Sequence, residues 1–98
     1  MIASNRELLE ELLTTQGFKV ITVPDGNAAL QELTSRQVDL AMLDVMMPHL
    51  NGFEVCEKIK SDPETYLIPV VLITALSEKH RIEGIKVGAD DFLTRPVD

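Results

Sequence analysis

Three polar side chains in this sequence stand at or just beyond the end of a run of apolar residues. Asp44 follows "DLAML" (39–43), Thr74 ends "IPVVLIT" (68–74), and Arg95 follows "DFLT" (91–94). A charge at the end of a buried strand needs a reason, because burying an unpaired carboxylate is costly. A carboxylate can attack phosphorus to give an acyl phosphate, while a hydroxyl and a cation can bind the phosphoryl oxygens. These three residue types therefore suit phosphoryl chemistry.

Each of the three also has a purely structural interpretation. Asp44 lies shortly before Pro48 and Gly52, and an aspartate in such a place can cap a turn. Thr74 can bond to nearby backbone at a strand end, and Arg95 can be an ordinary surface arginine. Both interpretations of Asp44 stay open on the residues alone. The functional one depends on the three side chains lying together.

The elements that would position these side chains alternate between helix and strand. The apolar spacing and end signals predict helices over 4–17, 27–37, 51–61 and 77–88, and strands over 18–23, 39–43, 68–74 and 91–94. Such alternation implies right-handed βαβ units and a parallel sheet, and continuously apolar strands imply helices on both faces. Ligands bind such sheets at the carboxyl ends of the strands. The expected fold is α/β, a doubly wound parallel sheet.

Local signals predict where several helices begin and end. Ser4 with Glu7 and Asn51 with Glu54 have the spacing of a capping box, and Ser77 can cap the helix that follows it. Gly17 and Gly88 are expected just beyond two helix ends.

The composition limits the classes of partner. The chain has 98 residues, enough for a single domain over 1–98, and a net charge of -7 from 9 Lys+Arg and 16 Asp+Glu. Such an acidic chain is not expected to bind nucleic acid directly, although Ser77–Lys86 is locally basic. No apolar run is long enough for a membrane span, no signal peptide is recognisable, and Cys56 is the single cysteine. We therefore expect a cytoplasmic protein.

Three segments of the chain together resemble a known family. The segments are "LAMLDVMMPHLNGFEVCEKIK", "IPVVLITALSE" and "GADDFLTRPVD". They are similar to the receiver (CheY-like) domain of two-component response regulators, and in particular to receivers of the diguanylate-cyclase and multidomain signalling type. The resemblance covers nearly the whole chain and implies a flavodoxin-like fold.

The resemblance also implies roles for individual residues. Asp44 would be the phosphoacceptor, and the Met46 backbone carbonyl would be a ligand of Mg²⁺. Thr74 would be the switch hydroxyl, and Phe92 the aromatic residue that moves inward on activation. A histidine kinase or phosphotransfer protein would supply the phosphoryl group, and an output domain or partner protein would read the switch. The domain would not be a turnover enzyme.

The sequence departs from the family pattern at two places. Arg95 stands where the family has a lysine, and the two are not interchangeable. The family's first strand ends in two acids, but here Ile2–Ser4 fills the last positions before the first helix, so that the second acid falls on Met1. We therefore expect a domain truncated at both ends, without the first strand or the last helix. Asp44 and Met46 would be the remaining metal ligands, an incomplete set for Mg²⁺.

The departures predict two further consequences. In the family the strand order is 2-1-3-4-5, so the expected loss is of the central strand. A rearranged sheet, a marginal fold or a homo-oligomer formed through exposed strand edges would follow. The alternative to a phosphoacceptor is a receiver-like interaction module, or fragment, that cannot be phosphorylated.

Overall fold

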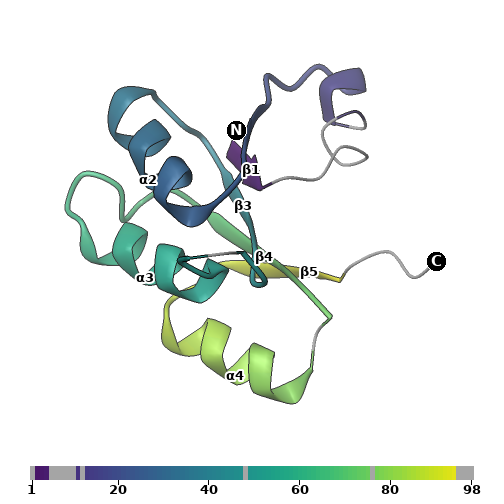
Figure 1. Cartoon of the computed structure of the whole chain (residues 1–98), viewed down its shortest axis with the longest axis vertical. Coiled ribbons are helices and arrows are strands. Elements are labelled where there is room, and N and C mark those ends of the chain that lie inside the picture. The colour runs from purple at the N-terminus through teal and green to yellow at the C-terminus, as the bar shows by residue number, and fades with distance from the viewer. Residues whose placement is uncertain (1, 5–10, 12, 48, 76, 95–98) are drawn as a thin grey trace.

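The chain folds around one parallel β-sheet (Figure 1). The computed structural model describes residues 2–4, 11, 13–47, 49–75 and 77–94. Its strands and helices are β1 (Ile2–Ser4), β2 (Ile21–Val23), α2 (Gly26–Ser35), β3 (Ala41–Asp44), α3 (Gly52–Ser61), β4 (Val70–Thr74), α4 (Glu78–Lys86) and β5 (Asp91–Thr94). The sheet order is β2-β1-β3-β4-β5, with every pair parallel. The predicted fold class is confirmed.

The first strand corrects an expectation from the sequence. Ile2–Ser4 pairs with Ile21–Val23 on one side and with residues 41–42 on the other, and so fills the central position. The sheet therefore keeps the family's strand order and is not rearranged. Ser4 is the last residue of β1, and residues 5–10, where its capping box would lie, are outside the described part. The expectation about a final helix concerns residues beyond 94, also outside it.

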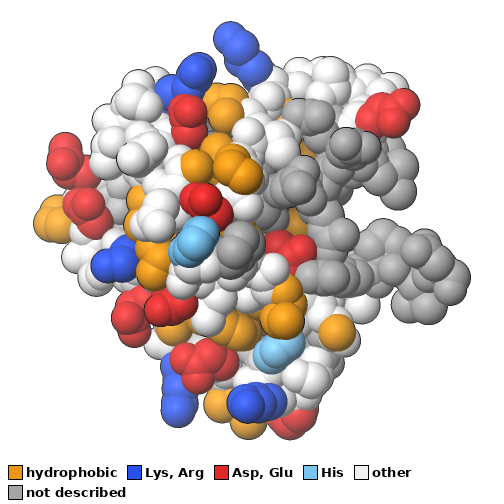
Figure 2. Space-filling model, in the orientation of Figure 1, with side chains coloured by type: hydrophobic (Ala, Val, Ile, Leu, Met, Phe, Trp, Pro, Cys, Tyr) orange, Lys and Arg blue, Asp and Glu red, His pale blue; other side chains and the backbone are white. Residues whose placement is uncertain are grey.

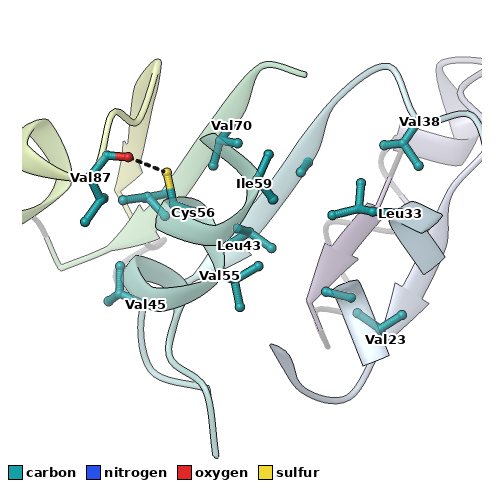
Figure 3. Close-up of a cluster of buried hydrophobic side chains, with 13 residues drawn as sticks. Val23, Leu33, Val38, Leu43, Val45, Val55, Cys56, Ile59, Val70 and Val87 are labelled. Carbon is teal, nitrogen blue, oxygen red and sulfur yellow. Dashed lines mark hydrogen bonds between the residues drawn. The ribbon is translucent and has the colours of Figure 1, made fainter. Parts of the chain in front are cut away.

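Apolar side chains pack on both faces of the sheet because successive strand residues point in opposite directions. Leu43 and Leu72 belong to the larger cluster, which also contains side chains of α2 and α3 (Figure 3). Met42 and Ile73, their neighbours in sequence, form a second cluster against Leu13 and Val20. This division confirms the predicted burial of both faces.

The predicted end signals of α3 and α4 are confirmed, whereas α2 (Gly26–Ser35, capped by Asp25) begins one residue before and ends two residues before the predicted 27–37. Asn51 and Glu54 form a reciprocal capping box at the start of α3, and the Ser77 side chain caps α4. Gly17 and Gly88 have φ angles of 92° and 87°, the left-handed conformation that glycine adopts beyond a helix end. These local ends fix where α3 and α4 begin relative to the sheet.

A charged network holds the amino-terminal edge of the sheet. The Lys60 ammonium donates hydrogen bonds to the carbonyl oxygens of Tyr66 and Ile68, at 3.2 and 2.8 Å. It also lies 2.8 Å from the Asp90 carboxylate, which in turn accepts a hydrogen bond from the Val70 amide. The hydrogen bond from Lys60 lowers the pKa of Asp90. Partial burial of the carboxylate acts in the opposite direction, and the hydrogen bond from the Val70 amide lowers the pKa further. The predicted site residues Asp44 and Thr74 lie at the opposite, carboxyl edge of the sheet.

Candidate functional site

Asp44 ends β3 at the carboxyl edge of the sheet and is only 8% exposed. Its Oδ1 accepts a hydrogen bond from the Met46 amide at 2.9 Å, which forms a turn closed by the side chain. The turn-capping interpretation is therefore correct. It does not compete with a functional one, because the same turn fixes the carboxylate at the edge where ligands bind such sheets.

Gly52 lets the start of α3 approach the end of β3. A Cβ atom at this position would lie 2.7 Å from the Asp44 carbonyl oxygen and 2.9 Å from the Val45 Cα. Contacts this short with backbone cannot be relieved by a side-chain rotation. The glycine at the end of the "LDVMMPHLNG" segment is thus required by close packing beside Asp44.

Thr74 ends the neighbouring strand and is fully buried. Asp44 is paired with Ile73, so Thr74 lies one residue further toward the same edge. Its Oγ1 is 2.7 Å from Nδ1 of His80 in the first turn of α4. Strand pairing therefore brings Asp44 and Thr74 to adjacent strand ends, as predicted, and the structure adds a histidine that we did not predict.

The inward face of α4 explains how His80 reaches Thr74. His80, Gly84 and Val87 recur at helical spacing; the first is partly buried and the other two are buried. The His80 ring also packs edge-on against Phe53, with 5.5 Å between ring centroids and 63° between ring planes. A polar residue on an otherwise inward stripe is the sequence signal that could have identified His80.

Phe92 packs against α4 from the neighbouring strand β5. Its side chain is partly buried and contacts the larger core cluster. A Cβ atom at Gly84 would lie 2.7 Å from Cζ of the Phe92 ring, nearer still to its Cε1, and 3.2 Å from Cδ1 of Leu72. The absence of a side chain at Gly84 therefore creates the space that the ring occupies.

Met46 is a further predicted site residue, and its amide binds the Asp44 carboxylate. Met46 follows the Asp44 turn and is 71% exposed, whereas Met47 packs against the core. Arg95 lies outside the described residues, so its role stays a prediction. His49 is exposed and has a positive φ of 67°.

The described residues do not supply a set of ligands that fits Mg²⁺. No group of three or more His, Cys, Asp or Glu side chains that could hold a metal ion occurs among them. Asp25, at the same edge of the sheet, uses its Oδ1 to cap α2 through the Ala28 amide at 2.9 Å. Ser4, at the end of β1, offers no carboxylate. Mg²⁺ requires near-octahedral oxygen coordination, so we assign no chemical step to the metal.

Charges are mixed over the surface of α4. The exposed cations Lys79, Arg81 and Lys86 are accompanied by the exposed carboxylates Glu78 and Glu83. Figure 2 shows positive and negative side chains interspersed over the described part of one face. The predicted local basic stretch is therefore a mixed surface.

The sequence and the fold match a family of signalling domains. The family model described as "Response regulator receiver domain" matches residues 3–98. The chain belongs to this family.

Individual relatives support the assignment. The chain is 50% identical over 98 residues to the response regulator PleD of Caulobacter vibrioides, covering 99% of this chain and 22% of PleD. Its fold is similar to the receiver domain of a histidine kinase from Syntrophus aciditrophicus, with a TM-score of 0.88, 32% identity, and 99% and 79% of the two chains covered. It is also similar to the Vibrio cholerae chemotaxis protein CheY4, with a TM-score of 0.91, 27% identity, and 99% and 86% covered. The chain thus spans about a fifth of the length of PleD.

In the part of the chain that the structure describes, no helix has the length and apolar character needed to cross a membrane.

Proposed function

We propose that this domain accepts a phosphoryl group on Asp44 and converts it into a conformational signal. The observation that carries the proposal is the position of Asp44, held by the Met46 amide at the carboxyl end of β3 beside the end of β4. Membership of the receiver family supports the same function. We assign the domain as substrate and catalyst of its own phosphorylation, not as a turnover enzyme.

The chemistry requires a nucleophile and groups that stabilise the negative charge on the phosphoryl oxygens. An Asp44 carboxylate oxygen attacks the phosphorus of a phosphohistidine; the new P–O bond forms as the P–N bond breaks, and the released imidazole takes up a proton. The Thr74 hydroxyl then donates a hydrogen bond to a phosphoryl oxygen, and Arg95 supplies positive charge. Phe92 follows by moving inward from its partly buried position.

The proposed partners follow from this role. A histidine kinase or phosphotransfer protein in the cytoplasm donates the phosphoryl group, and an output domain or partner protein reads α4 and β5. The large share of PleD that lies outside the matched region is consistent with an output carried elsewhere in a longer protein.

Incubation with acetyl phosphate tests the proposal. We expect the intact mass to rise by one phosphoryl group in the wild type and not in Asp44→Asn, and we expect hydroxylamine to remove the adduct because it cleaves acyl phosphates. Titrating Mg²⁺ should reveal only weak dependence on the metal. A wild type that stays unmodified at every metal concentration would contradict the proposal and favour the interaction module.

A further inference from the structure

The Thr74 hydroxyl, which the proposed function uses to read phosphorylation, is already held by a residue of α4. Thr74 is fully buried, and its Oγ1 lies 2.7 Å from the His80 Nδ1. The geometry points to His80 as a positioning residue that accepts the Thr74 hydrogen and thereby opposes the phosphorylated state. We call this contact between Thr74 and His80 the latch. It rests on the proposed function of Asp44 and deepens it.

The direction of the hydrogen bond decides what His80 does. A neutral imidazole has one nitrogen that donates and one that accepts, whereas an imidazolium only donates. A separation of 2.7 Å is typical of bonds that a hydroxyl donates and shorter than most bonds donated by nitrogen. The short separation therefore favours Nδ1 as the acceptor and the Thr74 hydroxyl as the donor.

His80 and a phosphoryl group on Asp44 compete for the single hydrogen of the Thr74 hydroxyl. A threonine hydroxyl carries a single hydrogen, and phosphoryl oxygens can only accept. If Thr74 gives its hydrogen to His80, it cannot at the same moment give it to a phosphoryl group on Asp44. Phosphorylation must therefore open the latch, and the latch holds the unphosphorylated state.

The contacts of His80 connect the latch to the exposed surface of α4. The His80 amide donates to the Ser77 side chain at 3.2 Å, which fixes the residue in the first turn of α4. Its ring packs edge-on against Phe53 in the first turn of α3. Opening the latch removes one hydrogen bond between β4 and α4, which would let the first turn of α4 shift together with the exposed Ile82 and Ile85.

Two substitutions at the same position separate the hydrogen bond from the packing. His80→Phe keeps an aromatic ring beside Phe53 but has no acceptor for Thr74. His80→Asn keeps an acceptor oxygen close to the place of Nδ1. The measurement is the affinity of the chain, in the presence of Mg²⁺, for beryllofluoride, an unreactive phosphoryl mimic.

The latch predicts an affinity gain in one variant only. We expect His80→Phe to bind beryllofluoride about two- to tenfold more tightly than the wild type, since one neutral hydrogen bond no longer has to be broken. His80→Asn should stay near the wild type. In a Thr74→Val background the effect of His80→Phe should vanish, because the cycle isolates the Thr74–His80 interaction. Weaker binding by His80→Phe, or the same gain without Thr74, would overturn the latch.

A second measurement judges the latch without any phosphoryl mimic. Nitrogen NMR of the imidazole in the free protein should show Nδ1 unprotonated and accepting a hydrogen bond, with the signal changed by Thr74→Val. A protonated Nδ1 would overturn the inference. A chain that shows the expected Nδ1 but binds no beryllofluoride would support the latch and contradict the phosphoacceptor function, so the two failures are distinguishable.

Discussion

Adding one methyl group at Gly84 should displace Phe92, the residue expected to report activation. The substitution Gly84→Ala has two opposing effects. Alanine in a helix interior is favoured over glycine by about 1 kcal/mol. The new Cβ would, however, lie 2.7 Å from the Phe92 Cζ, and overpacking a well-packed site costs about 1–3 kcal/mol.

The clash should exceed the gain in helix stability. Taking about 2 kcal/mol for the clash and about 1 kcal/mol for the helix, we expect a net loss of about 1 kcal/mol in the free energy of unfolding. The nearest atoms belong to the outer end of the Phe92 ring. We therefore expect the ring to rotate toward solvent while α4 stays folded. Phe92 should then lose the position that it now has against Gly84.

Urea denaturation and fluorine NMR can measure both consequences. The chain has three phenylalanines, so labelled protein gives three signals, and Phe92→Leu assigns one of them. Lys86→Ala, an exposed change on the same helix, is the matched control and should alter stability by less than about 0.5 kcal/mol. If Gly84→Ala stabilises the domain and leaves the Phe92 signal unmoved, the reasoning is refuted.

Three further predictions concern the scaffold. Lys60→Met should lower the free energy of unfolding by about 2 kcal/mol, because charge-assisted hydrogen bonds to two carbonyls and a carboxylate are lost; urea denaturation beside the exposed control Lys58→Met checks this, and equal effects would contradict it. Because the pKa of Asp90 is lowered below its ordinary value of 3.8, its contribution is present above that pH and is lost as the pH falls through the lower folded-state value. The half-exposed carboxylate should contribute less than about 1 kcal/mol, measured as a gap between wild type and Asp90→Asn that closes in acid; a gap independent of pH would be contrary. Burial raises the pKa of the Cys56 thiol from 9.0 to about 11, so the contribution of the buried neutral thiol to stability is fully present below pH 9.0 and is lost as the pH rises through about 11. A thiol reagent at neutral pH should therefore modify Cys56 only after unfolding, and immediate reaction of the native protein would refute this.

The order of elements could be predicted because its signals are local. Asn51 with Glu54, Ser77 and Gly88 mark helix ends through interactions within a few residues, and the structure confirms them. The central strand β1 could not be predicted. Three residues carry no periodic pattern, and their conformation is set by hydrogen bonds to β2 and β3, which are distant in sequence.

The site was predictable in its strand ends but not in its side-chain contacts. Asp44 and Thr74 were located correctly because parallel strands bring their carboxyl ends to one edge. The contact between Thr74 and His80 depends on how α4 lies across β4, and the space at Gly84 depends on where β5 places Phe92. Local residue spacing predicts neither the Thr74–His80 contact nor the space at Gly84, although the inward stripe of His80, Gly84 and Val87 indicates which face of α4 meets the sheet.

The most direct test of the account is to locate the phosphoryl group after treatment with acetyl phosphate. Borohydride reduction traps an acyl phosphate as a stable alcohol, and tandem mass spectrometry of peptides then identifies the modified residue. We expect the reduced residue to be Asp44 and the product to be lost in Asp44→Asn. A product at any other carboxylate, or none in the wild type, would contradict the central claim that Asp44 is the phosphoacceptor.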